Sequence, residues 1–448
     1  MRAAPAARAR TVLGAFALFV LTLLLVADAS SAAEDDEPPK VRFGLSLEYE
    51  HFSYVAGTGG RLVDARNALT ALPKIDWTPS ESVLLHLSAL LRQDFSEEER
   101  SRVDAHEGFL SVDRERWSLK VGRQFVTWGR ADSLRPTDVF KRHDLTDLIE
   151  NREAATDAVK LDLVQGSWTL ETIWAPIFDP DIVSFRPENR WSGLPTTADV
   201  PGVGPVNLSF REDRRQRPPA TLGSGQVGLR LGGSAQGWDF AGMYYYGYDR
   251  MPTVVRRELT RLDPIAREAT LTLVPIHKRI HVFGGDAAAT IAGWGLRGEA
   301  AYTLTADLPA EVAGNNDPYF RFTGGVDRTF SALPIGESLW AILQYALDTE
   351  PPPRSPLNRQ EVNPRLHPFR HAVVANAVWK YTEFMRLSFK GYVNLERGDF
   401  VLQPEFSWQP IDSMTIVVGG DVLGGETNTF FGQFRDNDRV RFRVSYAF

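Results

Sequence analysis

Ionisable side chains are most concentrated in the stretch that ends at Asp147. Nine of them, of both signs, fall between positions 130 and 147: Arg130, Asp132, Arg135, Asp138, Lys141, Arg142, His143, Asp144 and Asp147. Carboxylates and guanidiniums at this density either brace one another as ion pairs or remain solvated. The stretch therefore predicts either a segment folded into the protein and braced by ion pairs or an ordinary solvated loop.

Some of these residues also have the types used in acid–base catalysis. His143 lies beside Asp144, and His277 and His281 are four residues apart. A hydrolase would need a Ser, a His and an orienting polar group that converge. The sequence contains no nucleophile elbow, zinc-binding helix or phosphate loop. We therefore expect no enzyme, with no catalytic residues, metal or cofactor.

An alternation of polar and apolar residues predicts the elements that hold these side chains. The chain ends in "RVRFRVSYAF", where Val440, Phe442, Val444, Tyr446 and Phe448 alternate with Arg439, Arg441, Arg443, Ser445 and Ala447. The same alternation recurs at 41–50, 83–92 and 385–396. A period of two is that of a β-strand, and about ten residues suffice for a tilted strand to cross a bilayer.

The N terminus has the three parts of a secretory signal peptide. Arg2, Arg8 and Arg10 precede an apolar stretch at 12–26, and small residues precede a cleavage point after Ala33. A membrane anchor is the alternative, but the stretch is short for a helical span. We expect a cleaved peptide at 1–33 and a short periplasmic segment at 34–40. The chain has no Cys, which excludes a lipid-anchored lipoprotein and any disulfide.

The fold class follows from the alternation. After residue 33 no apolar run approaches the roughly twenty residues of a helical span. A β-sandwich also alternates, but it does not ordinarily carry so many charges per strand over such a length. We predict an all-β fold, a transmembrane antiparallel up-and-down barrel at 41–448, with about 18 strands within a range of about 16–20.

Loop lengths predict the orientation of this barrel. Short links such as 165–168 and 291–295 are typical of periplasmic turns, and long connections of external loops. In-folded or capping loops are expected at 128–156, 178–221, 249–277 and 350–369. Residues 251–277 form either an external hairpin or another transmembrane pair. Pro in 178–221 and 350–368 predicts stiffened caps rather than strands.

Two stretches resemble known families. "GRQ…WGRADSLRPTDVF", within 117–145, resembles outer-membrane barrels related to alginate-export porins, many of which have no assigned substrate. The resemblance implies a channel with a charged lumen and partly occluding loops, and it extends to Arg123, Gln124, Trp128, Gly129, Arg130 and Asp132. The terminal aromatics resemble the last strand of bacterial outer-membrane proteins. This resemblance implies that Tyr446 and Phe448 serve recognition by the barrel-assembly machinery.

Two sets of residues are candidates for control of passage. Lumen candidates are Lys120, Arg297, Arg321, Arg386, Lys390, Arg439, Arg441 and Arg443. Constriction-loop candidates are Arg123, Gln124, Trp128, Arg130, Asp132, Asp138, Arg142 and Asp144. We expect a weak anion preference from the last three lumen arginines, unless Glu48 and Glu50 on the first strand neutralise them.

Arg123 does not fit the alternation of its own segment, because it shares a parity with Trp117, Leu119 and Val121. Either Gly122 marks a bulge that turns Arg123 inward, which we favour, or Arg123 extends to the rim of the barrel.

These observations predict an outer-membrane channel for a small or polymeric solute of possible anionic character. The alternatives are a non-conducting receptor or structural barrel and, less favoured, an outer-membrane hydrolase. Expected partners are membrane lipid, lipopolysaccharide, the assembly machinery and a periplasmic or exporter protein. The basic loop 178–221 either binds an anionic ligand or is simply solvated. A net charge of -7 and a pI near 5.7 argue against nucleic acid.

Changing Tyr446 and Phe448 together to Asp should leave export intact but reduce insertion into the outer membrane, because the terminal strand loses its aromatic signal. The amount of heat-modifiable barrel in isolated membranes measures this. Normal amounts of heat-modifiable double variant would contradict the assignment.

Overall fold

The computed structural model describes residues 40–56, 63–132, 134–214, 217–306, 318–331, 333–349 and 369–448. The predicted signal peptide at 1–33, nearly all of the segment 34–40 and nearly all of the loop 350–369 lie outside the described residues. Among the residues described, no helix is long and apolar enough to cross a bilayer.

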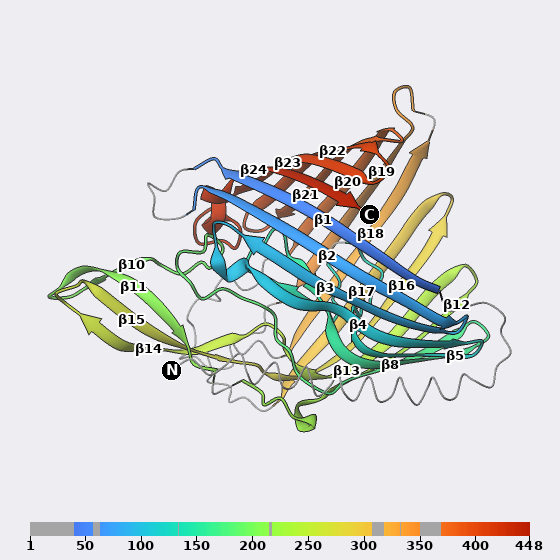
Figure 1. The fold of residues 1–448 in the computed structure, drawn as a ribbon, viewed down its shortest axis with the longest axis horizontal. Coiled ribbons are helices and arrows are strands. Elements are labelled where there is room, and N and C mark those ends of the chain that lie inside the picture. The colour runs from blue at the N-terminus through green and yellow to red at the C-terminus, as the bar shows by residue number, and fades with distance from the viewer. Residues whose placement is uncertain are drawn as a thin grey trace.

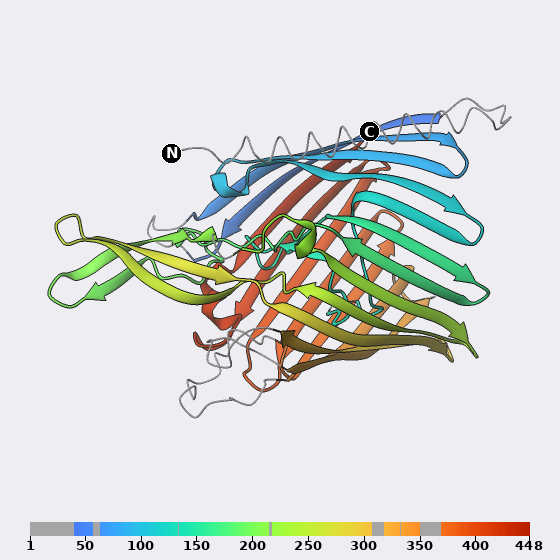
Figure 2. The ribbon, with the colours of Figure 1, turned by 90° about the horizontal axis from the view of Figure 1, so that it is seen from below.

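Eighteen strands form one sheet that closes on itself (Figures 1 and 2). The first nine are β1 (Lys40–Tyr54), β2 (Ala65–Ser80), β3 (Val83–Asp94), β4 (Arg102–Arg114), β5 (Trp117–Gln124), β8 (Thr156–Gln165), β9 (Trp168–Ala175), β12 (Gln226–Ala235) and β13 (Trp238–Tyr248). The others are β16 (Arg279–Ile291), β17 (Trp294–Ala306), β18 (Tyr319–Ser331), β19 (Ser338–Asp348), β20 (Ala372–Thr382), β21 (Met385–Asn394), β22 (Phe400–Ile411), β23 (Met414–Gly424) and β24 (Arg439–Ala447).

Each strand of this sheet pairs antiparallel with the next, and β24 closes the barrel against β1. The closing register runs from Tyr54↔Arg439 to Ser46↔Ala447. Closure leaves the sheet without an edge, so the backbone groups of every strand can pair within a bilayer. The predicted antiparallel barrel of about 18 strands is confirmed.

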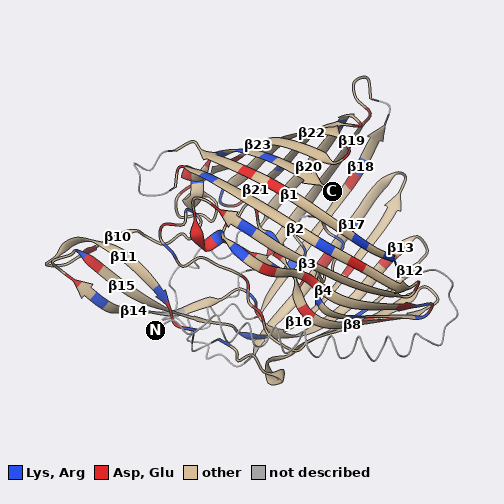
Figure 3. Cartoon of the chain, viewed as in Figure 1, with Lys and Arg blue, Asp and Glu red and all other residues tan. Residues whose placement is uncertain are grey.

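The two faces of the barrel differ as the alternation predicts. On β24, Val440 is 52% exposed on the outer face, whereas Arg439 on the inner face is 2% exposed. Phe43, Leu343 and Leu387 likewise project outward from other strands, with 76%, 54% and 45% exposure. Figure 3 shows charged residues distributed along the strands between long uncharged stretches. An apolar outer face suits lipid, and charged inward positions suit a wet lumen.

The two ends of the barrel differ in their connections. At one end, here the turn end, links such as those between β8 and β9 or β16 and β17 are short. In the second of these turns, Ala292 and Gly293 have φ angles of 50° and 79°, as a type I′ hairpin requires. At the other end, here the loop end, residues 125–155, 176–225 and 249–278 connect successive barrel strands.

A second sheet projects from the loop end (Figures 1 and 2). Its order is β10 (Thr197–Val200), β11 (Gly204–Glu212), β15 (Glu268–Ile276) and β14 (Thr253–Asp263), and β11 runs parallel to β15. Residues 251–277 therefore form a hairpin outside the barrel rather than a transmembrane pair. The prediction that 178–221 contains caps without strands is wrong, because Val206 and Leu208 alternate with polar residues and bury their side chains in this sheet.

Candidate functional site

Residues 125–155, between β5 and β8, form a segment that crosses the lumen. Its first part, 126–140, contacts β8, β9, β13, β16 and β17. Its second part, 142–154, contains the short pair β6 (Arg142–Asp144) and β7 (Arg152–Ala154) and contacts β1, β2, β3 and β24. These two groups of strands lie on opposite sides in the order of the sheet. The crossing segment (residues 125–155) is thus held at both walls.

The contact with the first wall, here the apolar anchor, is built on Trp128 and Phe140. These side chains are 2% and 1% exposed, and their rings meet edge to face at 5.2 Å. Phe140 also meets the ring of Tyr245 on β13 at 5.1 Å. Gly228 on β12 leaves the room they need, since a Cβ there would lie 2.3 Å from Phe140 and 2.5 Å from Trp128.

Polar contacts fix the orientation of the apolar anchor. The indole Nε1 of Trp128 donates to Glu171 on β9, and its backbone N–H donates to Asp138 at 3.0 Å. Arg130 donates to Asp286 on β16 at 2.6 Å, and Asp132 accepts from Arg297 on β17 at 2.7 Å. A carboxylate at this contact loses hydrogen bonds to water, so it requires a hydrogen-bond donor from the protein. The anchor therefore has one defined register against the wall.

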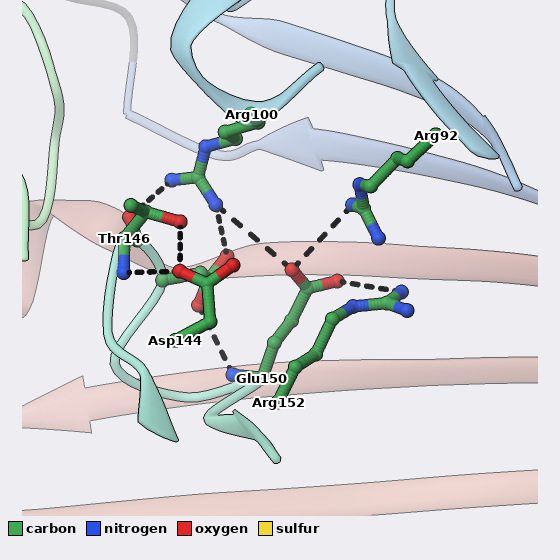
Figure 4. Close-up of a pocket in the computed structure, with 7 residues that line it drawn as sticks. Arg92, Arg100, Asp144, Thr146, Glu150 and Arg152 are labelled. Carbon is green, nitrogen blue, oxygen red and sulfur yellow. Dashed lines mark hydrogen bonds and ion pairs between the residues drawn. The ribbon is translucent and has the colours of Figure 1, made fainter. Parts of the chain in front are cut away.

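The contact with the second wall, here the charged anchor, is built on Asp147 and Glu150. Figure 4 shows Glu150 with the guanidiniums of Arg92, Arg100 and Arg152 around it. Asp147 lies 3.1 Å from Arg66 on β2, 2.5 Å from Arg439 on β24 and 3.7 Å from Arg100. Arg100 belongs to the 3-10 turn η1 (Glu98–Arg100). Glu150 lies 2.9 Å from Arg66 and within 3.9 Å of Arg92, Arg100 and Arg152.

Burial raises the pKa of both carboxyls, but the surrounding guanidiniums lower the pKa by a larger amount, so the net shift is downward. Arg439, followed by Arg100 and Arg66, holds the pKa of Asp147 well below its usual range. Arg66 is the main cause that brings the pKa of Glu150 from 4.5 to about 2. Because the folded-state pKa is depressed, this stabilisation is present above about pH 4.5 and is lost as the pH falls towards 2.

A second connection, 176–196, covers the loop end beside the crossing segment. Asn189 donates to the carbonyl of Thr146 at 3.0 Å and so joins the two connections. Arg190 has a side chain that is 1% exposed and donates to Asp64 at 2.7 Å. Trp191 is 3% exposed and packs under the guanidinium of Arg439 at 5.1 Å. These contacts narrow the loop end of the lumen further.

The three arginines of β24 each have carboxylate partners. Arg439 pairs with Asp147 and Asp421, Arg441 with Glu405 and Asp421, and Arg443 with Glu48 and Glu50. The longest of these separations is 3.6 Å. The surplus positive charge expected on this strand is absent from the described residues, because the closing seam and β22 and β23 supply the carboxylates.

The other lumen candidates divide into two groups. Arg297 pairs with Asp132 and Asp327, Arg321 pairs with Asp348, and Lys120 lies 4.4 Å over the ring of Phe109. Arg386 and Lys390 lie on β21 at positions that alternate with outward Leu387 and Phe389, so they face the lumen. Both are exposed, and within the described residues neither forms an ion pair.

Arg123 lies at the loop-end rim, so the favoured bulge is wrong. The pairing of β5 with β4 and β8 continues in register through Gly122 and Arg123. Arg123 instead forms two hydrogen bonds with its register partner Asp157, at 2.8 and 2.9 Å. Gln124 faces inward, is 1% exposed and donates to the carbonyl of Ala158 at 3.0 Å.

The remaining candidates of the crossing segment, Arg142 and Asp144, tie the short strand β6 to its surroundings. Arg142 donates to Asp179 at 2.8 Å, and Asp144 pairs with Arg102 at 2.9 Å. His277 and His281 do not converge, because the first contacts the carbonyl of Asp249 and the second contacts Tyr244. Within the described ranges, no group of three His, Cys, Asp or Glu residues could hold a metal ion.

Five residues that hold the crossing segment or cover it were not predicted as site residues from the sequence: Arg66, Arg100, Glu150, Arg190 and Trp191. Arg66 lies at an inward position of β2, as its parity with Thr70 would have shown. Arg100 and Glu150 lie in turns without periodicity, and their partners are distant in sequence. For these two no local signal exists.

A family model described as a protein of unknown function, DUF1302, matches residues 103–419, which is more than half of the chain. The chain belongs to the DUF1302 family. The matched region includes the whole crossing segment and most barrel strands. No curated protein matches this DUF1302 chain.

Solved structures share the barrel of this DUF1302 protein. OccD3 (OpdP) of Pseudomonas aeruginosa is 9% identical, with a TM-score of 0.50 over 91% of each chain. The outer membrane protein OpdK of Pseudomonas aeruginosa is 10% identical, with a TM-score of 0.50 over 91% of this chain and 98% of that one. The fold is therefore that of an outer-membrane porin-like β-barrel with transmembrane strands.

Gly228→Ala should disturb the apolar anchor without breaking a strand, because the added Cβ meets the rings of Trp128 and Phe140. We expect a loss of about 1–3 kcal/mol in the free energy of unfolding, measured by urea titration in lipid vesicles. Gly242→Ala on β13 is the matched control, since its Cβ meets nothing within 4 Å. Equal effects of the two substitutions would argue against the anchor.

Asp147→Asn should destabilise the charged anchor strongly, because three buried guanidiniums lose their shared carboxylate. We expect a loss of about 3–5 kcal/mol in the same titration. Asp132→Asn is the control, since its carboxylate is partly exposed and Arg297 keeps Asp327, so about 0–1 kcal/mol is expected. A mild effect of Asp147→Asn would show that the arginines find other partners.

Proposed function

We propose that this protein is an outer-membrane channel that conducts solutes around the crossing segment and prefers anions through Arg386 and Lys390. The observation that carries the proposal is a porin-like barrel with two lumen-facing cations that form no ion pair among the described residues. The short turns then face the periplasm and the long loops face the exterior, as in other bacterial barrels.

The surroundings of these two cations support a role in passage rather than in support of the wall. Arg386 and Lys390 flank Ser388 on β21, and their register partners on β22 are Ser407 and Gln403, neither of which is charged. Neighbouring Glu405 instead pairs with Arg441 at 3.3 Å. A cation that lacks a protein counter-charge attracts anionic solutes, and a low-dielectric wall strengthens its field.

The crossing segment strengthens the influence of Arg386 and Lys390 on a passing solute. A segment held at both walls divides the lumen and reduces the space through which a solute passes. Selectivity filters act through the charges that remain close to the passing ion. The resemblance of residues 117–145 to alginate-export porins supports passage through a charged and partly occluded lumen, and it implies no particular substrate.

A non-conducting receptor is the second candidate, and the loop-end packing favours it. Trp128, Phe140 and Asp147 of the crossing segment are buried, as are residues 189–191, and a hydrogen bond from Asn189 to Thr146 joins the two connections. A barrel closed in this way would bind a ligand at its exterior surface and conduct nothing. Single-channel recording on the mature chain distinguishes the two, because a receptor gives no conductance steps.

Replacement of Arg386 and Lys390 by Gln should shift the reversal potential in a salt gradient towards cation selectivity, because the unneutralised charges are removed. The free energy of unfolding should change little. Replacement of Arg441 and Arg443 by Gln is the control. It should lower the free energy of unfolding by about 1–3 kcal/mol through lost charged hydrogen bonds and leave the reversal potential unchanged. A cation-selective wild type would reject the anion preference.

A further inference from the structure

A groove of about 460 Å³ lies at the turn end, where the turns after β18 and β20 meet the end of β22. Phe384, Met385 and Trp408 line its apolar part, and Phe384 and Trp408 are 44% and 39% exposed. Met385 and Trp408 are register partners on β21 and β22. Both share the outward parity of Leu387 and Phe406, so this part of the groove faces the bilayer. Aromatic side chains at a strand end lie at headgroup depth.

The groove also carries negative charge at its edge. Glu337 and Glu383 line it, and Glu337 is neutralised by Lys380 at 2.6 Å. Glu383 is exposed, and within the described part of the chain it forms no ion pair. One free carboxylate beside Trp408 and Phe384 is complementary to an ammonium group, which binds both carboxylates and aromatic faces.

We propose that this groove binds a phospholipid with an ammonium headgroup, of the phosphatidylethanolamine class. The ammonium group lies between the carboxylate of Glu383 and the ring of Trp408. The acyl chains continue along the outward side chains of β21 and β22. The volume lies within the range of about 300–1,000 Å³ that is typical of ligand sites. This inference is independent of conduction and of solute selectivity.

Native mass spectrometry of the complete mature barrel tests the inference. The barrel is released from detergent micelles that contain phosphatidylethanolamine or phosphatidylglycerol with identical acyl chains. We expect one phosphatidylethanolamine to be retained with about tenfold preference, which corresponds to about 1.4 kcal/mol. Glu383→Gln should remove most of this preference, and Trp408→Leu should weaken it.

Glu81→Gln is the matched control, because Glu81 is an exposed carboxylate in the turn between β2 and β3 at the same end of the barrel. It should retain the wild-type preference. A heat-modifiability gel checks that each variant is folded, and the wild-type comparison of the two lipids needs no variant. Equal retention of both lipids, as expected if a polypeptide segment occupies the groove, would overturn the proposal. Unchanged preference in Glu383→Gln would overturn it as well.

Discussion

Burial of the Asp147 carboxylate constrains much of the lumen. A carboxylate removed from water is tolerated when cations and donors replace the lost hydration. Here the cations come from β2, from η1 and from β24, which are far apart in sequence. Arg439 is also the first residue of the strand that closes the barrel against β1. Docking of the crossing segment and closure of the sheet therefore share one guanidinium, and neither is complete without the other.

The apolar anchor complements this network by a different kind of force. Trp128 and Phe140 bury their rings against wall residues and gain from exclusion of water, whereas the charged anchor depends on matched ionisation. Gly228 shows how far the wall is adapted to these rings, since even a methyl group at that position meets them. Two anchors with unrelated physical causes hold the same segment, so acid weakens the ion pairs of the charged anchor and leaves the ring packing of the apolar anchor.

The sequence predicted the barrel well because alternation is a local property that each strand repeats, as β24 shows from Arg439 to Ala447. It also predicted that Glu48 and Glu50 would approach the closing strand, because closure brings the ends together. It failed where pairing is decided across the lumen. Asp147 neutralises Arg439 from a distant segment, so charge on one strand did not reveal net charge. For Arg123 the favoured bulge was wrong and the alternative position at the rim holds, because its partner Asp157 lies opposite it on the neighbouring strand β8.

The small sheet at the loop end imposes an order on folding. β11 precedes the barrel strands β12 and β13, and its parallel partner β15 follows them. Their pairing closes a loop that contains a complete transmembrane hairpin, and such non-local contacts form slowly. Before β12 and β13 are in place, β11 and β15 have no fixed separation. Once the barrel holds that hairpin, the entropy of closure has already been lost, and the four strands can associate as a late and nearly local event.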